Sequence, residues 1–389
     1  MQVSPFHLHW TLHPNIYVAP YLPNPIQING DIGKQEWNDV PWSAPFDDIR
    51  GIEDAIPNER PGPECQTRIK IMWDHDFIYI AAMIESDMEV RATYLERNSP
   101  IFHQDSDFEV FIDPNSSCHD YKELEMNAID TIWNLMLDKP YIDGGQEHSG
   151  RIAGPGDDHY YEVSGQKTAA RLIEGSLNQA GYQRTVWAVE IALSHRDTMK
   201  HQHHALIPKE GHLWRINFSR VEKKGTLNWT WQKQRVWDPK LRKHCGKVDM
   251  HMPDSWGFIR FGPNMVMAKE SDTLIGQVPQ VDILNGKGVD PLWPQRIAVM
   301  NVYYAQRRFN EENGEFAETI QDLFEYLDEG IMMPFMDKIE MITSDQLSSY
   351  IVFVTGFDKV LSVDNSRFME ITNRELSGIE GKVIEPVIE

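Results

Sequence analysis

The sequence predicts a mainly β protein: a jelly-roll-type antiparallel β-sandwich followed by a small α+β domain. Up to about residue 260, short runs rich in β-branched and aromatic residues alternate with turn residues. About ten such runs occur without a helical pattern between them, which indicates a sandwich or jelly roll rather than a parallel sheet. Beyond Pro291 the pattern changes to helical periodicity followed by two strand-like runs.

The strand-like runs are bounded by turn residues, which set their approximate ends. The clearest hairpin joins residues 67–74 to residues 77–85 across His75 and Asp76. The further strands expected in this region cover residues 107–113, 121–130, 131–137, 183–193, 213–222, 227–232 and 256–262.

The C-terminal region begins with a helix signal. Pro294 suits the first turn of a helix, and residues 295–314 carry apolar residues near helical spacing. A second helix is expected from Thr319 to Leu327, before strands at residues 348–356 and 360–364. The chain is therefore expected to contain three parts: a sandwich over residues 1–263, a linker over 264–290 and a small α+β domain over 291–389.

Composition narrows the function classes. The 389 residues carry a formal net charge of −22, with 41% hydrophobic and 25% charged residues. Such an acidic surface repels phosphate backbones and anionic lipids, so neither nucleic acid nor a membrane is expected as a partner. The start of the chain shows neither a signal peptide nor a transmembrane segment. The sequence as written predicts a cytoplasmic protein, or an extracellular one if its start is incomplete.

Cysteine usage argues against two further classes. The three cysteines are far apart and form no CxxC pair, so neither a zinc knuckle nor a disulfide framework is expected.

The stretch HQDSDFEVFIDP (103–114) carries acidic residues at every second position. Asp105, Asp107 and Glu109 stand at alternate positions, and Phe108, Val110 and Ile112 occupy the other positions. This alternation places the carboxylates on one face of a strand. These carboxylates could be catalytic, ligate a metal, accept hydrogen bonds from a hydroxyl-rich ligand or face solvent. Catalysis is disfavoured because neighbours on one strand point the same way, whereas glycosidase carboxyls flank the bond they cleave.

Several motifs in order resemble the family 9 carbohydrate-binding modules, and in particular the family 9-like subgroup, over residues of about 20–262. The resemblance is carried by INGDIGKQEWNDVPWS (28–43), TRIKIMWDHDFIYIAAMIES (67–86), HQDSDFEVFIDP (103–114), WAVEIALS (187–194) and DMHMPDSWGFIRFG (249–262). The tail at residues 293–330 is similar to the helix-then-sheet unit of pilin-like proteins.

The resemblance implies a function as well as a fold. Members of the family bind oligo- or polysaccharides without cleaving them, often at a chain end, between two tryptophans. Many are attached to glycoside hydrolases and take part in polysaccharide catabolism, and many carry structural calcium. The family pattern places Glu109 at the ligand-binding glutamate and Asn127 at an asparagine on the next strand. Trp231, with Asn228 three residues before it, fits one aromatic wall of the binding cleft.

Two positions depart from the family pattern. The second tryptophan falls near Phe102 and His103, where this chain has no tryptophan, and Phe102 is the expected replacement. An arginine expected two residues before Asn127 is Glu125 here. The sugar specificity is therefore expected to differ from that of the family.

A structural calcium ion is also expected. Asp105, Asp107 and Asp113 supply the hard oxygen ligands that calcium prefers. Three alternatives to simple sugar binding remain open: a glycosidic-bond hydrolase or its accessory protein, a haem- or metal-binding sandwich, and a vestigial interaction module. The residues considered for haem ligation are Met126, His251 and Met252.

Overall fold

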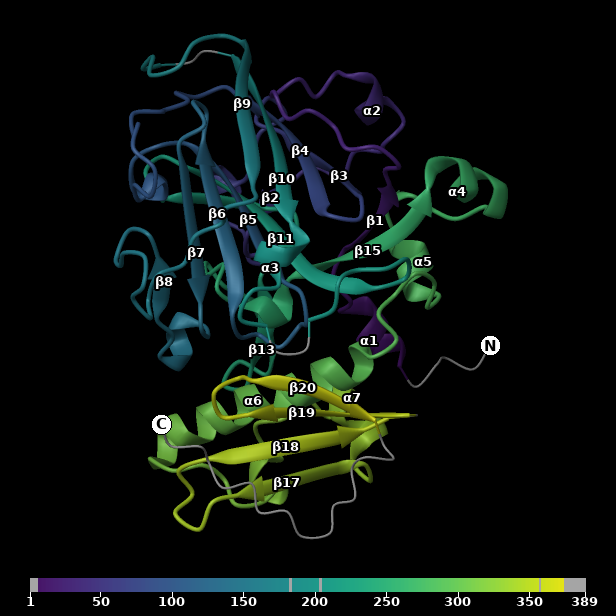
Figure 1. Ribbon diagram of the computed structural model, residues 1–389. Coiled ribbons are helices and arrows are strands. Elements are labelled where there is room, and N and C mark those ends of the chain that lie inside the picture. Colours follow the sequence, from purple (N-terminus) through teal and green to yellow (C-terminus); the bar gives the residue numbers. More distant parts are fainter. Residues whose placement is uncertain (1–5, 182–183, 203–204, 357, 374–389) are drawn as a thin grey trace. The chain divides into compact units, whose positions relative to one another are not determined.

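The computed structural model describes residues 6–181, 184–202, 205–356 and 358–373 (Figure 1). The chain divides into two compact units. The sandwich unit comprises Trp10–Asp238 and Lys243–Asp290, and the C-terminal unit comprises Met1–His9, Pro239–Arg242 and Pro291–Glu389. The predicted fold class is confirmed: the protein is mainly β, with a small α+β region at its C-terminal end.

The sandwich unit is built on one large sheet with the order β8-β7-β6-β5-β11-β15-β1-β3-β4-β10-β9. Neighbouring strands are antiparallel except that β1 runs parallel to both β15 and β3. A branch adds β12 and β2 beside β11, and β16 pairs with β1. The strands of the large sheet are β1 (Ile16–Tyr21), β2 (Asp47–Asp48), β3 (Thr67–Trp73), β4 (Phe77–Ser86), β5 (Asp107–Asp113), β6 (Tyr121–Asn127), β7 (Ile132–Leu137), β8 (Glu147–Ser149), β9 (Lys167–Glu174), β10 (Thr185–Ser194), β11 (Leu213–Glu222), β12 (Leu227–Thr230), β15 (Gly257–Asn264) and β16 (Gly276–Gln277).

Short elements fill the connections of the sandwich unit. They are helices α2 (Gln35–Asn38), α3 (His195–Thr198), α4 (Met265–Ser271) and α5 (Gln280–Leu284), the hairpin β13 (Arg235–Asp238) and β14 (Lys243–Gly246), and the 3-10 turns η1 (Pro57–Glu59), η2 (Ile101–His103), η3 (Tyr141–Asp143) and η4 (Pro253–Ser255). The stretch 264–290, expected as a linker, contributes β16 to the large sheet.

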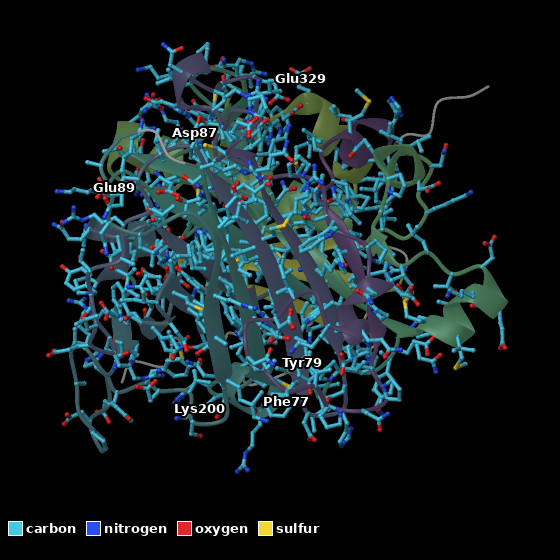
Figure 2. All side chains as sticks on the ribbon, turned by 90° about the horizontal axis from the view of Figure 1, so that it is seen from above. Phe77, Tyr79, Asp87, Glu89, Lys200 and Glu329 are labelled. Atoms are coloured by element: carbon cyan, nitrogen blue, oxygen red, sulfur yellow. The ribbon has the colours of Figure 1, made fainter. Side chains whose placement is uncertain are left out.

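Alternation along the strands decides which side chains enter the core. In β5, Phe108, Val110 and Ile112 join a core shared with residues of β3, β4 and β10, so the two halves of the sheet pack face to face. The same alternation appears in β4, where Phe77 and Tyr79 lie beside each other (Figure 2), with ring centroids 5.9 Å apart. The opposite face of β5 and β6, which we call the polar face, carries Glu109, Glu123 and Glu125 beside Phe111 and Tyr121 of a second hydrophobic cluster.

The C-terminal unit packs one long helix against a four-stranded antiparallel sheet. Helix α6 (Trp293–Asn313) has Pro294 in its first turn and ends at Gly314, whose φ of 82° is the left-handed conformation that glycine adopts readily. Its other elements are β17 (Ile339–Thr343), β18 (Tyr350–Thr355), β19 (Lys359–Asp364), β20 (Met369–Asn373), α7 (Glu329–Met332), η5 (Gln321–Leu323) and η6 (Met333–Phe335). Helix α1 (His7–Thr11) includes residues of both units. The predicted helix over Thr319–Leu327 is wrong, because only the 3-10 turn η5 forms there.

Within the part of the chain that the structure describes, no helix is both long and apolar enough to cross a lipid bilayer.

Candidate functional site

A cavity of about 560 Å³ opens on the polar face of β5 and β6, beside Trp133 and Leu135 of β7. This volume falls within the range of about 300–1,000 Å³ that is typical of small-ligand sites. Its lining residues come from these strands and from the segments around Phe102, Tyr141, Arg151, Asn228 and His251.

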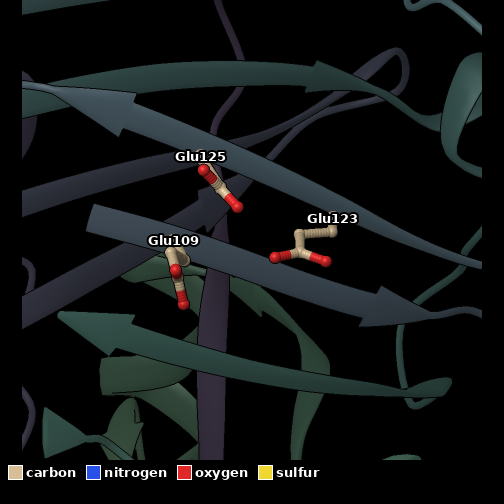
Figure 3. Close-up of side chains that lie close together, drawn as sticks. All are labelled: Glu109, Glu123 and Glu125. Carbon is tan, nitrogen blue, oxygen red and sulfur yellow. The ribbon is translucent and has the colours of Figure 1, made fainter. Parts of the chain in front are cut away.

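The floor of the cavity is a cluster of three glutamates, which we call the glutamate triad: Glu109, Glu123 and Glu125. Antiparallel pairing places Glu109 of β5 directly opposite Glu125 of β6, and Glu123 lies two residues before Glu125 on the same face. One carboxylate oxygen from each lies within 4.8 Å of the other two. Figure 3 shows the triad gathered across the two strands, with one oxygen of Glu123 on the side of Glu109 and Glu125.

The triad is almost completely withdrawn from solvent. The exposed fractions are 4% for Glu109, 5% for Glu123 and 2% for Glu125. Burial raises the pKa of Glu109 to about 7. The pKa values of Glu123 and Glu125 also lie well above normal, because burial and the neighbouring carboxylates both disfavour their charged forms.

The nearest basic side chains do not neutralise the triad. Arg151 forms an ion pair with Glu147, and its guanidinium lies 5.0 Å from the centre of the Trp133 ring. The imidazole of His251 lies 3.9 Å from Glu123, but burial lowers the pKa of His251 to about 4, so the ring is neutral at physiological pH. No neighbouring cation in the described ranges of the chain therefore stabilises the charged forms of the three carboxyls.

Aromatic side chains form the walls. Phe102 is nearly parallel to Trp133, with an angle of 10° and a centroid distance of 6.3 Å. That gap is too narrow for a sugar ring between them, because van der Waals contact on both faces needs about 7–8 Å. Tyr141 is 46% exposed and packs edge-on against His251. The aromatic surfaces open to a ligand are thus those of Phe102 and Tyr141.

Four of the predicted ligand-binding residues meet at this cavity. Phe102, His103, Glu109 and Asn228 all line it. Asn228 comes from β12, where Val221 of β11 is its direct partner, so it shares the polar face with Glu109.

The prediction for Trp231 is wrong. Trp231 is only 4% exposed and belongs to the sandwich core, where its indole N–H donates to Gln277. Side chains alternate along a strand, so the polar position of Asn228 directs Trp229 and Trp231 to the opposite face.

Asn127 is also a structural residue. It is fully buried, and its amide oxygen accepts hydrogen bonds from the backbone N–H groups of Ile129 and Thr131. It therefore holds the turn between β6 and β7. Its amide nitrogen donates to Asp105 and to the backbone oxygen of Tyr94.

The three predicted metal ligands do not form one site. Asp105 accepts hydrogen bonds from Thr93, Tyr94 and Asn127, so its oxygens are already used. Asp107 and Asp113 stand at opposite ends of β5, about 20 Å apart at roughly 3.3 Å per residue. Asp113 holds the following turn through the N–H of Cys118.

The residues considered for haem ligation are separated too. Met126 belongs to the sandwich core on one face of β6, whereas His251 lines the cavity on the other. Met252 is buried, at 4% exposure, and is not among the residues that line this cavity.

Other residues that line the cavity were not predicted from the sequence; among them are Glu123, Trp133, Tyr141 and Arg151. The sequence did carry a pattern that indicates Glu123. Tyr121, Glu123, Glu125 and Asn127 stand at every second position, as Asp107 and Glu109 do, so each set shares one face of its strand. Pairing the two runs as a hairpin would have brought the glutamates together. Tyr141 and Arg151 lie in connecting segments, which carry no such pattern.

Comparisons with known proteins agree with the sequence-based resemblance. Residues 28–139 match the model of the family described as "Carbohydrate family 9 binding domain-like", which confirms the resemblance for this part of the chain. This region includes the whole glutamate triad. No curated protein matches the chain.

Solved structures with a similar arrangement cover 64% of this chain. One is a "putative carbohydrate-binding protein" from Bacteroides uniformis, with 13% identity, a TM-score of 0.44 and 99% of its own length covered. Two others are a family 9 carbohydrate-binding module from Caldicellulosiruptor kristjanssonii, in complex with cellotriose and with glucose. Each has 15% identity and a TM-score of 0.37, and 94% and 96% of these chains are covered.

Proposed function

We propose that the protein binds a saccharide, without cleaving it, in the cavity above the glutamate triad. The observation that carries this proposal is the combination of buried carboxylates and open aromatic faces in one cavity, within a region similar to a carbohydrate-binding family. Carboxylates accept strongly from sugar hydroxyls. The exposed ring of Tyr141 and the ring of Phe102 offer flat surfaces for the apolar face of a pyranose.

The volume supports one or two sugar units rather than a long chain. The cavity lies at the surface of the sheet and is closed at its floor by the triad, so a chain would enter by one end. From this shape we infer recognition of a chain end, and from the family resemblance a plant-type oligo- or polysaccharide. A role in polysaccharide catabolism, alongside glycoside hydrolases, is the biological context that we infer from the family.

Hydrolysis is not part of the proposal. Glu109, Glu123 and Glu125 project from adjacent strands onto one face, within 4.8 Å of one another. A glycosidase holds its two carboxyls on either side of the scissile bond, whereas these three lie together on one face of the sheet. An assay for release of reducing sugar tests this point, and activity that disappears in Glu109→Gln would contradict it.

Calorimetric titration with glucose and cellotriose tests the binding proposal. The Phe102→Ala substitution should weaken saccharide binding about 5- to 150-fold relative to the wild type. This range corresponds to a cost of about 1–3 kcal/mol for the loss of a stacking surface, as for nucleic-acid bases. Trp231→Phe is the matched control, because this aromatic side chain lies in the core. Equal weakening in both variants, or no binding by the wild type, would contradict the proposal.

A further inference from the structure

We propose that the glutamate triad is a calcium site, with Glu109, Glu123 and Glu125 as its protein ligands. The role of this ion in recognising sugar rests on the proposed function above, but the ion site itself does not. It lies at a different place from the aspartates that the sequence suggested.

The geometry of the oxygens fits one ion. Calcium–oxygen bonds are about 2.3–2.6 Å long, so two oxygens on the same ion are at most about 5 Å apart. One oxygen from each glutamate meets this condition, since all three lie within 4.8 Å of one another. Three carboxylates can supply three to six oxygens, and calcium accepts six to eight in flexible geometry.

An unpartnered atom provides the second observation. Among the described residues, the buried Oε2 atom of Glu123 has no hydrogen-bond partner. Leaving a buried polar atom unpaired is costly, and more so when it carries charge. Figure 3 shows one oxygen of the Glu123 carboxylate on the side of Glu109 and Glu125, and an ion bound by this carboxylate would offset the cost of its unpaired atom.

The charge balance also favours a cation. Within the described part of the chain, no lysine or arginine forms an ion pair with a triad member, and Arg151 is engaged by Glu147. Ionising Glu109 and Glu125 together would place like charges directly opposite each other on neighbouring strands, which is destabilising. A divalent ion would convert this repulsion into attraction.

Calcium fits the site better than magnesium or zinc. Magnesium requires near-ideal octahedral geometry and keeps several waters, whereas the triad supplies carboxylates from a rigid sheet. Zinc favours nitrogen and sulfur ligands, and the cluster contains neither. Because the cavity is open above the triad, sugar hydroxyls could complete the coordination of the ion.

Terbium luminescence gives a direct test. Terbium replaces calcium and emits when a nearby tryptophan is excited, and Trp133 is the cross-strand partner of Glu125. We expect saturable terbium emission from the wild type that calcium displaces. Glu123→Gln should weaken calcium binding at least tenfold.

The control is Glu89→Gln, since Glu89 lies at the surface and forms only a loose ion pair with Arg91 (Figure 2). Its calcium affinity should equal that of the wild type. Near-ultraviolet circular dichroism verifies that both variants are folded. If Glu123→Gln is not folded, Glu125→Gln takes its place as the triad variant. The proposal is overturned if the wild type shows no saturable binding, or if a folded triad variant binds calcium as tightly as Glu89→Gln.

Saccharide titration in calcium and in EDTA separates the two proposals. Sugar binding that weakens in EDTA supports a role for the ion in recognition. Sugar binding without any calcium site overturns this inference and leaves the proposed function standing. A calcium site without sugar binding leaves the ion assignment standing and overturns the proposed function.

Discussion

Replacing Glu109 by glutamine should stabilise the ion-free protein at high pH. Glu109 is buried directly opposite Glu125, and glutamine keeps its shape without its charge. Binding sites often contain residues that destabilise the folded protein, so removing one of them can increase stability while weakening binding.

The magnitude follows from the pKa of Glu109, which burial raises from 4.5 to about 7. Each pKa unit corresponds to about 1.4 kcal/mol, so ionised Glu109 destabilises the folded protein by about 3 kcal/mol. Because the folded-state pKa is the higher one, the folded protein holds its proton more tightly. The stabilisation that comes from this tighter proton binding by Glu109 is complete below pH 4.5 and is lost as the pH rises through 7.

Urea unfolding in EDTA measures the effect at two pH values. Glu109→Gln should raise the free energy of unfolding by about 3 kcal/mol at pH 8, and by less than about 0.5 kcal/mol at pH 4.5. Glu89→Gln should change neither value by more than about 0.5 kcal/mol. A Glu109→Gln protein that is less stable than the wild type at pH 8 would refute the reasoning.

Three further substitutions test other parts of the account. Trp231→Ala should cost about 3–5 kcal/mol in urea unfolding, because the side chain fills the core, and unchanged stability would show that the indole is not packed there. Glu190→Ala should cost about 3–5 kcal/mol, since the buried carboxylate accepts hydrogen bonds from Trp37 and Lys34; a loss below about 1 kcal/mol would contradict this role. Burial lowers the pKa of His13 to about 4, so stability should fall by about 3 kcal/mol as the pH drops from 6.5 to 4. His13→Asn should flatten that part of the pH profile, and an unchanged profile would exclude His13 as its cause.

The neutral state of His13 has a clear structural cause. Its Nε2 atom accepts a hydrogen bond from the backbone N–H of Asp290, so its Nδ1 atom carries the proton and donates to the backbone oxygen of Pro14. A second proton on the ring would remove the acceptor. The unfolded chain has no such constraint and takes up the proton near pH 6.5.

Local patterns were sufficient to predict much of the fold. Alternation in 107–113 predicted β5 and the face of Glu109, and Pro294 marked the start of α6. Sequence could not reveal that β1 runs parallel to its neighbours, because strand order depends on contacts between distant segments. The helix expected at 319–327 did not form although Leu323 and Leu327 are buried. The Asp322 side chain accepts hydrogen bonds from Thr319 there, and the segment folds as the 3-10 turn η5.

The site was predicted in part, for a physical reason. Glu109, Phe102 and Asn228 reach the cavity because strand alternation fixes their faces once the register is known. Trp231 was misplaced because an aromatic residue suits both a core and a binding cleft, and only the register of β12 against β11 decides between them. Asp105 was misplaced because an acceptor for backbone N–H groups has the same sequence signature as a metal ligand.

A crystal structure of the protein soaked with cellotriose and calcium tests the central claim most directly. We expect a pyranose in the cavity, with its ring against Phe102 or Tyr141 and its hydroxyls within hydrogen-bonding distance of the glutamate triad or of an ion bound to it. A sugar bound elsewhere on the sandwich, with this cavity unoccupied, would contradict the account.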